Sequence, residues 1–379
     1  MFSMAWFPAP VQTAIGTTLE EWGKDGRSFH LLAFLGEKDA AFVPVLQQLC
    51  ADRHLTLAGA LFPRLLADGQ CCESGVLLLR LEGCPAPLLL DNVGSHDQVD
   101  TTACALAGYV EMNLPADREA SVFCIFDALV PNIATHLDAW YLCLADRVRY
   151  FGVNAGSETF APMPCLFDNR RVVSSGVLLQ LLPDHPGACL NHDYGVPDTH
   201  LTATSAENNR IVQIDWQPPL DIYRDLMQRC YGVEITQENF YEHAVHFPFG
   251  ILRADGEVLV RIPVALGNDG SIACVGEIPP NSVLTLLDAR TGVHRAPLQL
   301  ANDLEALAAP VRGEDLLLFY CAGRRMHMGG EIGSELDKVA EATGARHVYG
   351  ALSLGEIGGA RSGGYPLFHN ATLVGVPCR

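Results

Sequence analysis

The sequence is poor in charged residues, and basic residues are the scarcest of them. Charged residues make up 18% of the 379 residues, and 25 lysines and arginines face 44 aspartates and glutamates, giving a net charge of −19. This balance leaves no basic stripe to neutralise phosphates, which argues against nucleic acid as a general partner. A hydrophobic content of 49% excludes a largely disordered chain, and the length suggests two domains or more.

Signals for export and membrane insertion are missing as well. No apolar run reaches the roughly 18 to 20 residues that a bilayer span needs. No Lys or Arg precedes Lys24, so the first residues lack the basic start of a secretory signal. The 13 cysteines form no C-x-x-C pair and lie in apolar runs such as those at Cys124 and Cys321. Buried free thiols in a reducing compartment explain this best, and we expect a cytoplasmic protein.

Catalytic motifs are incomplete in the glycine-rich stretch 349–370, where they would be sought first. Gly358 and Gly363 have the first spacing of a phosphate loop, but the lysine that should follow is absent. The segment 351–355, A-L-S-L-G, approaches the nucleophile elbow G-x-S-x-G but begins with alanine. The chain also has no H-E-x-x-H zinc motif. Because no catalytic constellation is complete, we expect a protein that is not an enzyme.

What the sequence does contain is an internal repeat. Residues 74–81 read S-G-V-L-L-L-R-L and residues 175–182 read S-G-V-L-L-Q-L-L. Each follows an apolar strand, a segment with helical spacing and a second strand, and a third copy of this order ends the chain. The predicted first strands are 30–34, 122–126 and 316–321. The alternative is a chance recurrence of a common α/β order of elements.

The repeat predicts an α/β fold with layered α+β character, built from strand–helix–strand–strand units with mixed sheets. Residues 181–200 are rich in Pro, His and Asp and indicate an irregular connection. Residues 247–288 contain strand-like runs broken by Asp-Gly turns and indicate hairpins. Placing the boundary near Trp216 divides the chain into domains at 1–216 and 217–379.

Histidines offer the main candidates for metal ligands. His246 lies three residues after His243, on one face of a predicted helix, and His327 lies between two methionines. A haem needs only one or two axial ligands from anywhere in the chain, so spacing does not exclude it. The alternative for each is a structural or surface histidine.

Arg324 follows an apolar strand within C-A-G-R-R, at residues 321–325. Layered α/β folds place binding groups at such strand ends, and an arginine there can hold a carboxylate or a propionate with two hydrogen bonds. The alternative, which the sequence favours equally, is that Arg324 lies at a solvent-exposed helix start with its charge facing outward.

These segments resemble a known family. F-Y-C-A-G-R (319–324), G-A-L-S-L-G-E-I (350–357) and F-H-N-A-T-L-V (368–374) are similar to the C-terminal domain of FIST proteins. F-G-V-N-A-G (151–156) and S-S-G-V-L-L (174–179) resemble the FIST N-terminal domain. The resemblance runs from about Phe29 to Cys378.

The resemblance implies an intracellular sensor that binds a small ligand and regulates a histidine kinase or a cyclic-dinucleotide signalling protein. One branch of the family is similar to haem-binding nitric-oxide sensors, so haem is the first expected cofactor, with His246 and His327 as axial candidates. An amino acid or similar metabolite is the second expected ligand. The resemblance assigns ligand binding to the C-terminal motif and to one residue of the N-terminal motif, namely Cys321, Arg324, Glu356, His369, Asn370 and Asn154.

The sequence leaves two other classes of protein open. The first is an enzyme that uses Cys321 as nucleophile with His369 or Glu356 nearby. The second is an adaptor whose pocket holds nothing.

Overall fold

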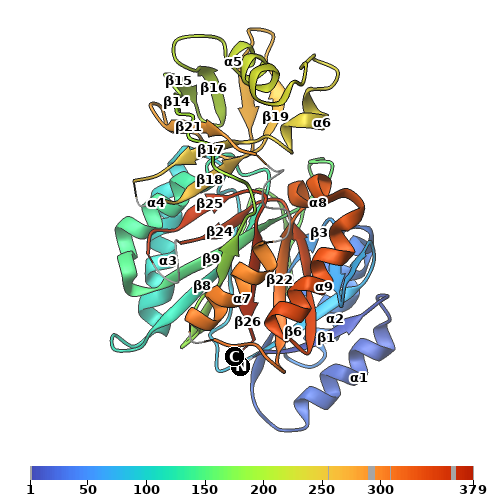
Figure 1. The fold of residues 1–379 in the computed structure, drawn as a ribbon. Coiled ribbons are helices and arrows are strands. Elements are labelled where there is room, and N and C mark those ends of the chain that lie inside the picture. Colours follow the sequence, from blue (N-terminus) through green and yellow to red (C-terminus); the bar gives the residue numbers. More distant parts are fainter. Residues whose placement is uncertain (1, 255, 289–294, 308, 360–363, 379) are drawn as a thin grey trace.

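The computed structural model describes residues 2–254, 256–288, 295–307, 309–359 and 364–378. About 30% of the chain is helix and about 34% is strand, in several mixed sheets, which confirms the predicted fold class. A large body carries a smaller lobe, residues 201–286, at one end (Figure 1). Within the described ranges, no helix has the length and apolar character needed to cross a bilayer.

The first repeat unit opens the chain. Its first long strand is followed by a short helix that returns the chain to a parallel second strand, and a small hairpin precedes the third. The elements are β1 (Phe2–Phe7), α1 (Gln12–Gly23), β2 (Phe29–Gly36), η1 (Glu37–Phe42), α2 (Val43–Ala51), β3 (Thr56–Phe62), β4 (Leu65–Ala67), β5 (Gln70–Cys72) and β6 (Val76–Glu82).

The second unit repeats this order with longer helices. Its elements are β7 (Leu88–Leu90), η2 (His96–Gln98), α3 (Val99–Asn113), β8 (Ala120–Asp127), α4 (Ile133–Leu144), η3 (Ala145–Arg147), β9 (Arg149–Ala155), β10 (Leu166–Asp168), β11 (Val172–Val173) and β12 (Val177–Pro183). The connection predicted to be irregular contains a further strand, β13 (Cys189–Asn191), which pairs with the last strand of the chain. Its three residues are too few to give a periodic signal.

The third unit ends the chain. Its elements are α7 (Ala296–Ala306), β22 (Asp315–Cys321), α8 (Ala322–Met328), η6 (Gly329–Glu331), α9 (Ile332–Thr343), β23 (His347–Ser353), β24 (Glu356–Gly358), β25 (Leu367–His369) and β26 (Leu373–Pro377). Part of the glycine-rich stretch, including Gly363, lies outside the described residues.

All three units share one strand topology. The orders β6-β2-β3, β12-β8-β9 and β26-β22-β23 each combine a parallel pair with an antiparallel third strand. Gly59, Gly152 and Gly350, the fourth residues of β3, β9 and β23, occupy the same register position in the three units. A Cβ on them would lie 2.2, 2.1 and 1.7 Å from the carbonyl oxygens of Ala33, Cys124 and Leu318, respectively. The repeat is therefore confirmed.

The units are joined by a cyclic exchange of short strands. β4 of the first unit pairs with β23 of the third, β24 of the third pairs with β9 of the second, and β10 of the second pairs with β3 of the first. Phe34, Phe123 and Phe319, one from each unit, meet in the core with ring centroids 5.7 to 6.5 Å apart. Each sheet therefore depends on two units.

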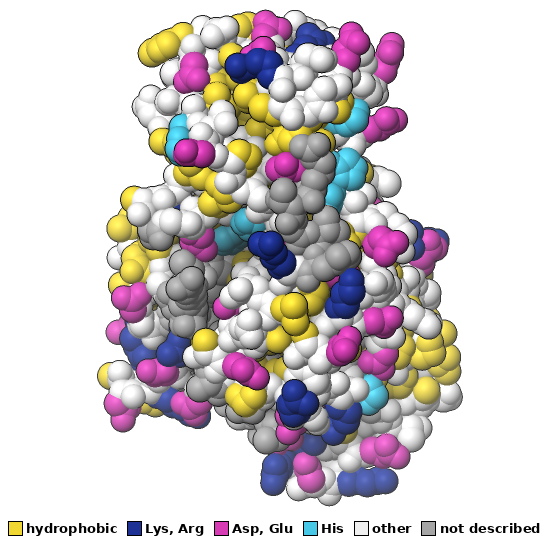
Figure 2. All heavy atoms as spheres, viewed as in Figure 1, with side chains coloured by type: hydrophobic (Ala, Val, Ile, Leu, Met, Phe, Trp, Pro, Cys, Tyr) yellow, Lys and Arg dark blue, Asp and Glu magenta, His cyan; other side chains and the backbone are white. Residues whose placement is uncertain are grey.

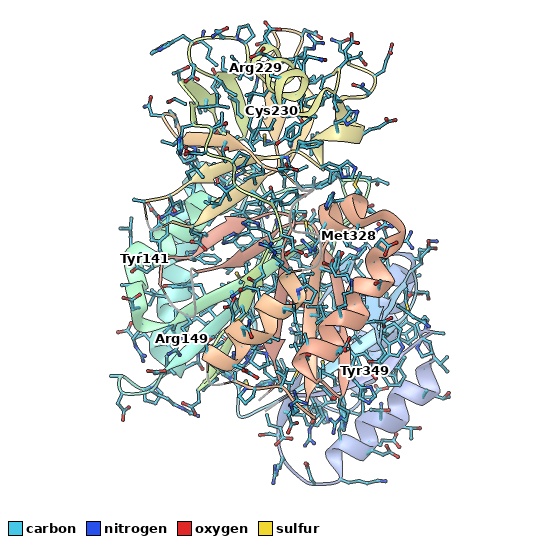
Figure 3. All side chains as sticks on the ribbon, in the orientation of Figure 1. Tyr141, Arg149, Arg229, Cys230, Met328 and Tyr349 are labelled. Atoms are coloured by element: carbon cyan, nitrogen blue, oxygen red, sulfur yellow. The ribbon has the colours of Figure 1, made fainter. Side chains whose placement is uncertain are left out.

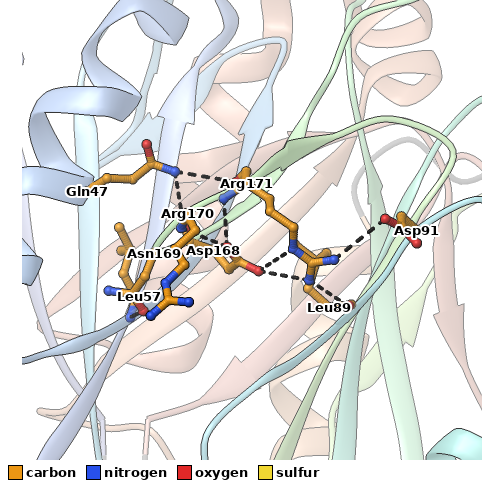
Figure 4. Close-up of polar contacts among 8 residues, drawn as sticks. All are labelled: Gln47, Leu57, Leu89, Asp91, Asp168, Asn169, Arg170 and Arg171. Carbon is orange, nitrogen blue, oxygen red and sulfur yellow. Dashed lines mark hydrogen bonds and ion pairs between the residues drawn. The ribbon is translucent and has the colours of Figure 1, made fainter.

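Figure 4 shows how one exchanged hairpin is fixed. The Asn169 side chain accepts a hydrogen bond from the Leu57 amide and donates one to the Leu55 carbonyl, both at 2.8 Å. The Gln47 amide donates to the Asp168 carbonyl, also at 2.8 Å. These bonds hold the β10–β11 turn against the first unit.

The lobe consists of two four-stranded antiparallel sheets and short helices. Tyr223, Phe240 and Phe249 form the centre of its own apolar core. Its elements are β14 (Leu201–Thr202), β15 (Ser205–Glu207), β16 (Arg210–Gln213), α5 (Pro219–Leu226), η4 (Met227–Tyr231), α6 (Phe240–Ala244), β17 (Phe249–Leu252), β18 (Val258–Arg261), β19 (Pro263–Leu266), β20 (Ile272–Cys274) and β21 (Val283–Leu286). The predicted division at 216/217 falls between β16 and α5 and stays a prediction.

Candidate functional site

A cavity of about 640 Å³ lies where the lobe meets the body. Its wall combines β13 and α7 of the body with the turn between β17 and β18 of the lobe. Histidine side chains occur around this junction on the face that Figure 2 displays. Volumes of about 300 to 1,000 Å³ are usual for small-ligand sites, so the cavity is the natural candidate for one.

One side of the cavity is a hydrogen-bonded polar wall. The Asp303 carboxylate on α7 accepts a hydrogen bond from the Gln299 amide at 2.8 Å and one from the Asn191 amide at 2.9 Å. All three side chains line the cavity. Because two amides from different elements fix it, this carboxylate has a defined orientation before any ligand binds.

Two histidines, His192 and His369, line the same cavity. Burial lowers the pKa of His192 to about 4 and that of His369 to about 3. The ring of His369 lies 3.3 Å from the Gly358 carbonyl. Both rings are therefore neutral near pH 7 and contribute no positive charge to the cavity.

Glu356 lies behind the cavity wall, fully buried at the start of β24. Its carboxylate accepts hydrogen bonds from the hydroxyls of Ser353, at 2.5 Å, and Thr372, at 2.9 Å. Burial raises its pKa to about 7, although the two hydroxyls oppose the shift. Thr372 also lines the cavity. Its hydrogen bond therefore connects the cavity with the Glu356 carboxyl group, which titrates near neutral pH.

Cys321 does not have the environment of a nucleophile. It ends β22, is 3% exposed, and its sulfur accepts a hydrogen bond from the Ala371 amide at 3.1 Å. Burial, with a smaller effect of the Glu356 charge, raises the pKa of its thiol far above the usual range. A reactive cysteine needs the opposite, a lowered pKa and solvent access.

Arg324 is neither exposed nor directed at the cavity. Its guanidinium donates to both carboxylate oxygens of Glu335, at 2.9 and 2.5 Å, and to Asp193 at 2.8 Å. Tyr320 also donates to Glu335. Arg324 therefore lies in a buried ion cluster that ties α8 and α9 to the segment after β13, and not at a solvated helix start. Its predicted role in ligand binding stays a prediction.

The two asparagines are buried beside this region. The Asn370 side chain accepts a hydrogen bond from the Ile262 amide at 3.4 Å and donates to the His369 carbonyl at 2.9 Å, so it joins the body to the lobe. Asn154 is 1% exposed, and its Oδ1 has no hydrogen-bond partner among the described residues. Gly355, at φ +154°, passes close to it, because a Cβ there would lie 2.8 Å from the Asn154 Nδ2.

The predicted haem ligands, His246 and His327, do contact each other across the junction. Their Nδ1 atoms are 2.5 Å apart, and burial lowers the pKa of His246 and brings that of His327 to about 4. Figure 3 places the neighbouring Met328 at the end of α8, below the lobe. The two rings contact each other through their Nδ1 atoms, and neither His246 nor His327 belongs to the described lining of the cavity. Their assignment as haem ligands stays a prediction.

The structure thus separates the predicted residues into distinct environments. Of the predicted ligand-binding residues, His369 alone lines the cavity among the described residues, and Glu356 is one side chain away. Within the described residues, no group of three or more His, Cys, Asp or Glu side chains is arranged to hold a metal ion.

Roles for Asp303, Asn191, Glu335 and Thr372 were not predicted from the sequence. A signal existed for Glu335, since it lies between Ile332 and Leu336 on the apolar face of α9, where a charged residue implies a buried partner.

Two family models match the chain. The FIST N domain matches residues 31–217, and the FIST C domain matches residues 219–359. Such domains are small-ligand sensory domains of signalling proteins. The chain belongs to the FIST family, which confirms the predicted resemblance. Among curated proteins, none matches the chain.

Proposed function

We propose that this FIST protein binds its ligand in the cavity between lobe and body and signals by changing how the two are held together. The observation that carries the proposal is the composition of the wall, in which β13 and α7 of the body face the β17–β18 turn of the lobe. A ligand that contacts both parts stabilises the arrangement in which both contacts are made.

Several polar contacts at the junction could report ligand binding. His246 of the lobe contacts His327 of the body, and the Tyr194 hydroxyl donates to the Val245 carbonyl at 2.7 Å. Glu277 of the lobe accepts hydrogen bonds from the Thr135 hydroxyl and amide of α4. A partner that recognises surface on both sides of this junction would distinguish the ligand-bound state. We propose a histidine kinase or a cyclic-dinucleotide signalling protein as that partner.

The cavity can be closed by substitution while the body is preserved. Ala306 is exposed on α7 and lines the cavity, so Ala306→Trp fills the space. Leu298 lies on the same helix, is 62% exposed and does not line the cavity, so Leu298→Trp is the matched control.

A thermal-shift screen of amino acids and other small metabolites tests the proposal. A ligand that binds the native state must raise the melting temperature. We expect the shift in the wild type and in Leu298→Trp, and its loss in Ala306→Trp. An equal shift in all three proteins would place the ligand elsewhere and refute the proposal.

A haem-dependent version of the proposal rests on the two neutral histidines of the cavity. His192 or His369 would supply the axial nitrogen, since neutral imidazole is the form that binds iron. Bound iron would supply nitric-oxide binding. Against this version, the described lining contains no lysine or arginine for the propionates. We therefore rank it second to a metabolite.

An absorption spectrum after haem supply decides between the two. The haem version predicts a Soret band that shifts with nitric oxide and is lost in His192→Ala or His369→Ala. A protein without a Soret band contradicts the haem version and leaves the metabolite version intact.

A further inference from the structure

The charge of the cavity lining constrains the chemistry of its ligand. Asp303 on α7 is an acidic residue of the described lining, and that lining contains no lysine or arginine. The two histidines of this lining are neutral near pH 7. We propose that the ligand is a small aliphatic amine that binds as a cation and carries no carboxylate. This inference rests on the proposed function, because it assumes that the cavity is the ligand site.

Asp303 has the geometry of an ammonium acceptor. A carboxylate offers about four lone-pair positions, and the Gln299 and Asn191 amides occupy two of them, one on each oxygen. The remaining positions can accept hydrogen bonds from a ligand, and an ammonium group supplies three donors. A fixed carboxylate also loses little side-chain entropy when a cation binds.

Apolar side chains supply contacts for an alkyl chain. They lie on β13, in the segment after it, at the start of β18, and at and just after the end of α7, and they are Leu190, Val196, Val258, Ala306 and Leu307. A ligand with an ammonium group at Asp303 and an alkyl chain along these residues uses both kinds of surface. A carboxylate in the same place would meet like charge without a basic partner among the described lining, which disfavours amino acids and other acids.

A series of probes with one chain length and different charge tests the inference. Hexylamine, hexanol and hexanoate are titrated into the purified full chain by calorimetry. A charged hydrogen bond contributes enough for about a tenfold change in affinity or more. We expect hexylamine to bind at least about tenfold more tightly than hexanol, and hexanoate to bind more weakly than either.

Two variants assign the preference to Asp303. Asp303→Asn removes the charge at nearly constant size and is expected to weaken hexylamine binding by about tenfold or more, without changing hexanol binding. Glu305→Gln removes an exposed charge from the same helix, outside the cavity lining, and is expected to change neither. The unchanged binding of hexanol also shows that the Asp303→Asn cavity is still folded.

The inference fails if hexylamine does not bind, if hexanol or hexanoate binds as tightly as hexylamine, or if Asp303→Asn leaves hexylamine binding unchanged. Ala306→Trp separates this failure from that of the proposed function. If it abolishes binding of whichever probe binds, the cavity is still the ligand site and only the preference for amines is wrong. If the probes bind Ala306→Trp as well as the wild type, both proposals are overturned.

Discussion

The buried ion cluster around Arg324 gives the sharpest prediction about stability. The Arg324 side chain is 2% exposed, and those of Glu335 and Asp193 are 0% and 7% exposed. Arg324→Met keeps most of the side-chain volume but leaves two buried carboxylates without their cation. Removing one partner of a buried ion pair costs about 3 to 5 kcal/mol, because the remaining charge is not compensated.

That magnitude is large compared with the whole stability of a domain, which is about 5 to 15 kcal/mol. Urea unfolding followed by far-ultraviolet circular dichroism measures the loss as a lower midpoint. Arg346→Met is the matched control, because Arg346 pairs with Asp315 at 2.9 Å but is 58% exposed. We expect a much smaller shift in the control, since water screens exposed pairs.

A double substitution separates the buried charge from the lost packing. Arg324→Met with Glu335→Gln removes the cation and one of the two carboxylates together, so it should recover part of the lost midpoint. Equal midpoints for Arg324→Met and Arg346→Met would show that the cluster is not a desolvated ion network, and the reasoning would be wrong.

Further predictions concern individual groups. The pKa of Glu356 is about 7 in the native state against an ordinary value of 4.5, so between these pH values the native carboxyl holds a proton that the unfolded one has lost. The stabilising contribution of this proton is complete below about pH 4.5 and is lost as the pH rises through about 7. Urea midpoints measured on both sides of this window should fall with rising pH in the wild type more than in Glu356→Gln, and equal slopes would contradict the assignment. Cys321 should resist iodoacetamide in the native protein while the exposed Cys104, Cys143 and Cys230 react. Mass spectrometry of the modified peptides measures the labelling of each cysteine. Rapid labelling of Cys321 would contradict this prediction and favour an enzyme with Cys321 as nucleophile. Gly350→Ala should destabilise the protein by about 2 kcal/mol or more, because the added Cβ would lie 1.7 Å from the Leu318 carbonyl oxygen. The control is Gly108→Ala, where nothing lies within 4 Å of the added Cβ, and it should leave the urea midpoint unchanged or raised. Similar urea midpoints for the two variants would refute the close approach at Gly350.

Much of the fold could be predicted from local patterns. The long strands of each unit are continuous apolar runs, as expected for strands buried on both faces, and the helices between them show three- and four-residue spacing. These signals are local, so a single sequence contains them.

The exchange of short strands could not be predicted in this way. β4, β10 and β24 each have three residues, and each pairs with a strand of a different unit. Such a strand gives almost no periodic signal, and its partner depends on how whole units assemble. Without that assembly, the sequence could not show that each sheet is shared.

The candidate site shows the same limit. The cavity combines residues from β13, the lobe turn and α7, which are separated by dozens of positions, and no motif unites Asn191 with Asp303. The resemblance to the FIST family pointed to polar residues of the C-terminal motif. The structure uses several of these, notably Arg324 and Glu356, in buried hydrogen-bonded clusters behind the cavity.

The most direct test of the account is a crystal structure of the protein with the metabolite that gives the largest stabilisation in the thermal-shift screen. We predict ligand density in the cavity, in contact with Asp303 on α7 and with Val258 at the start of β18. Density for that ligand outside this cavity, with the junction between lobe and body unchanged, would contradict it.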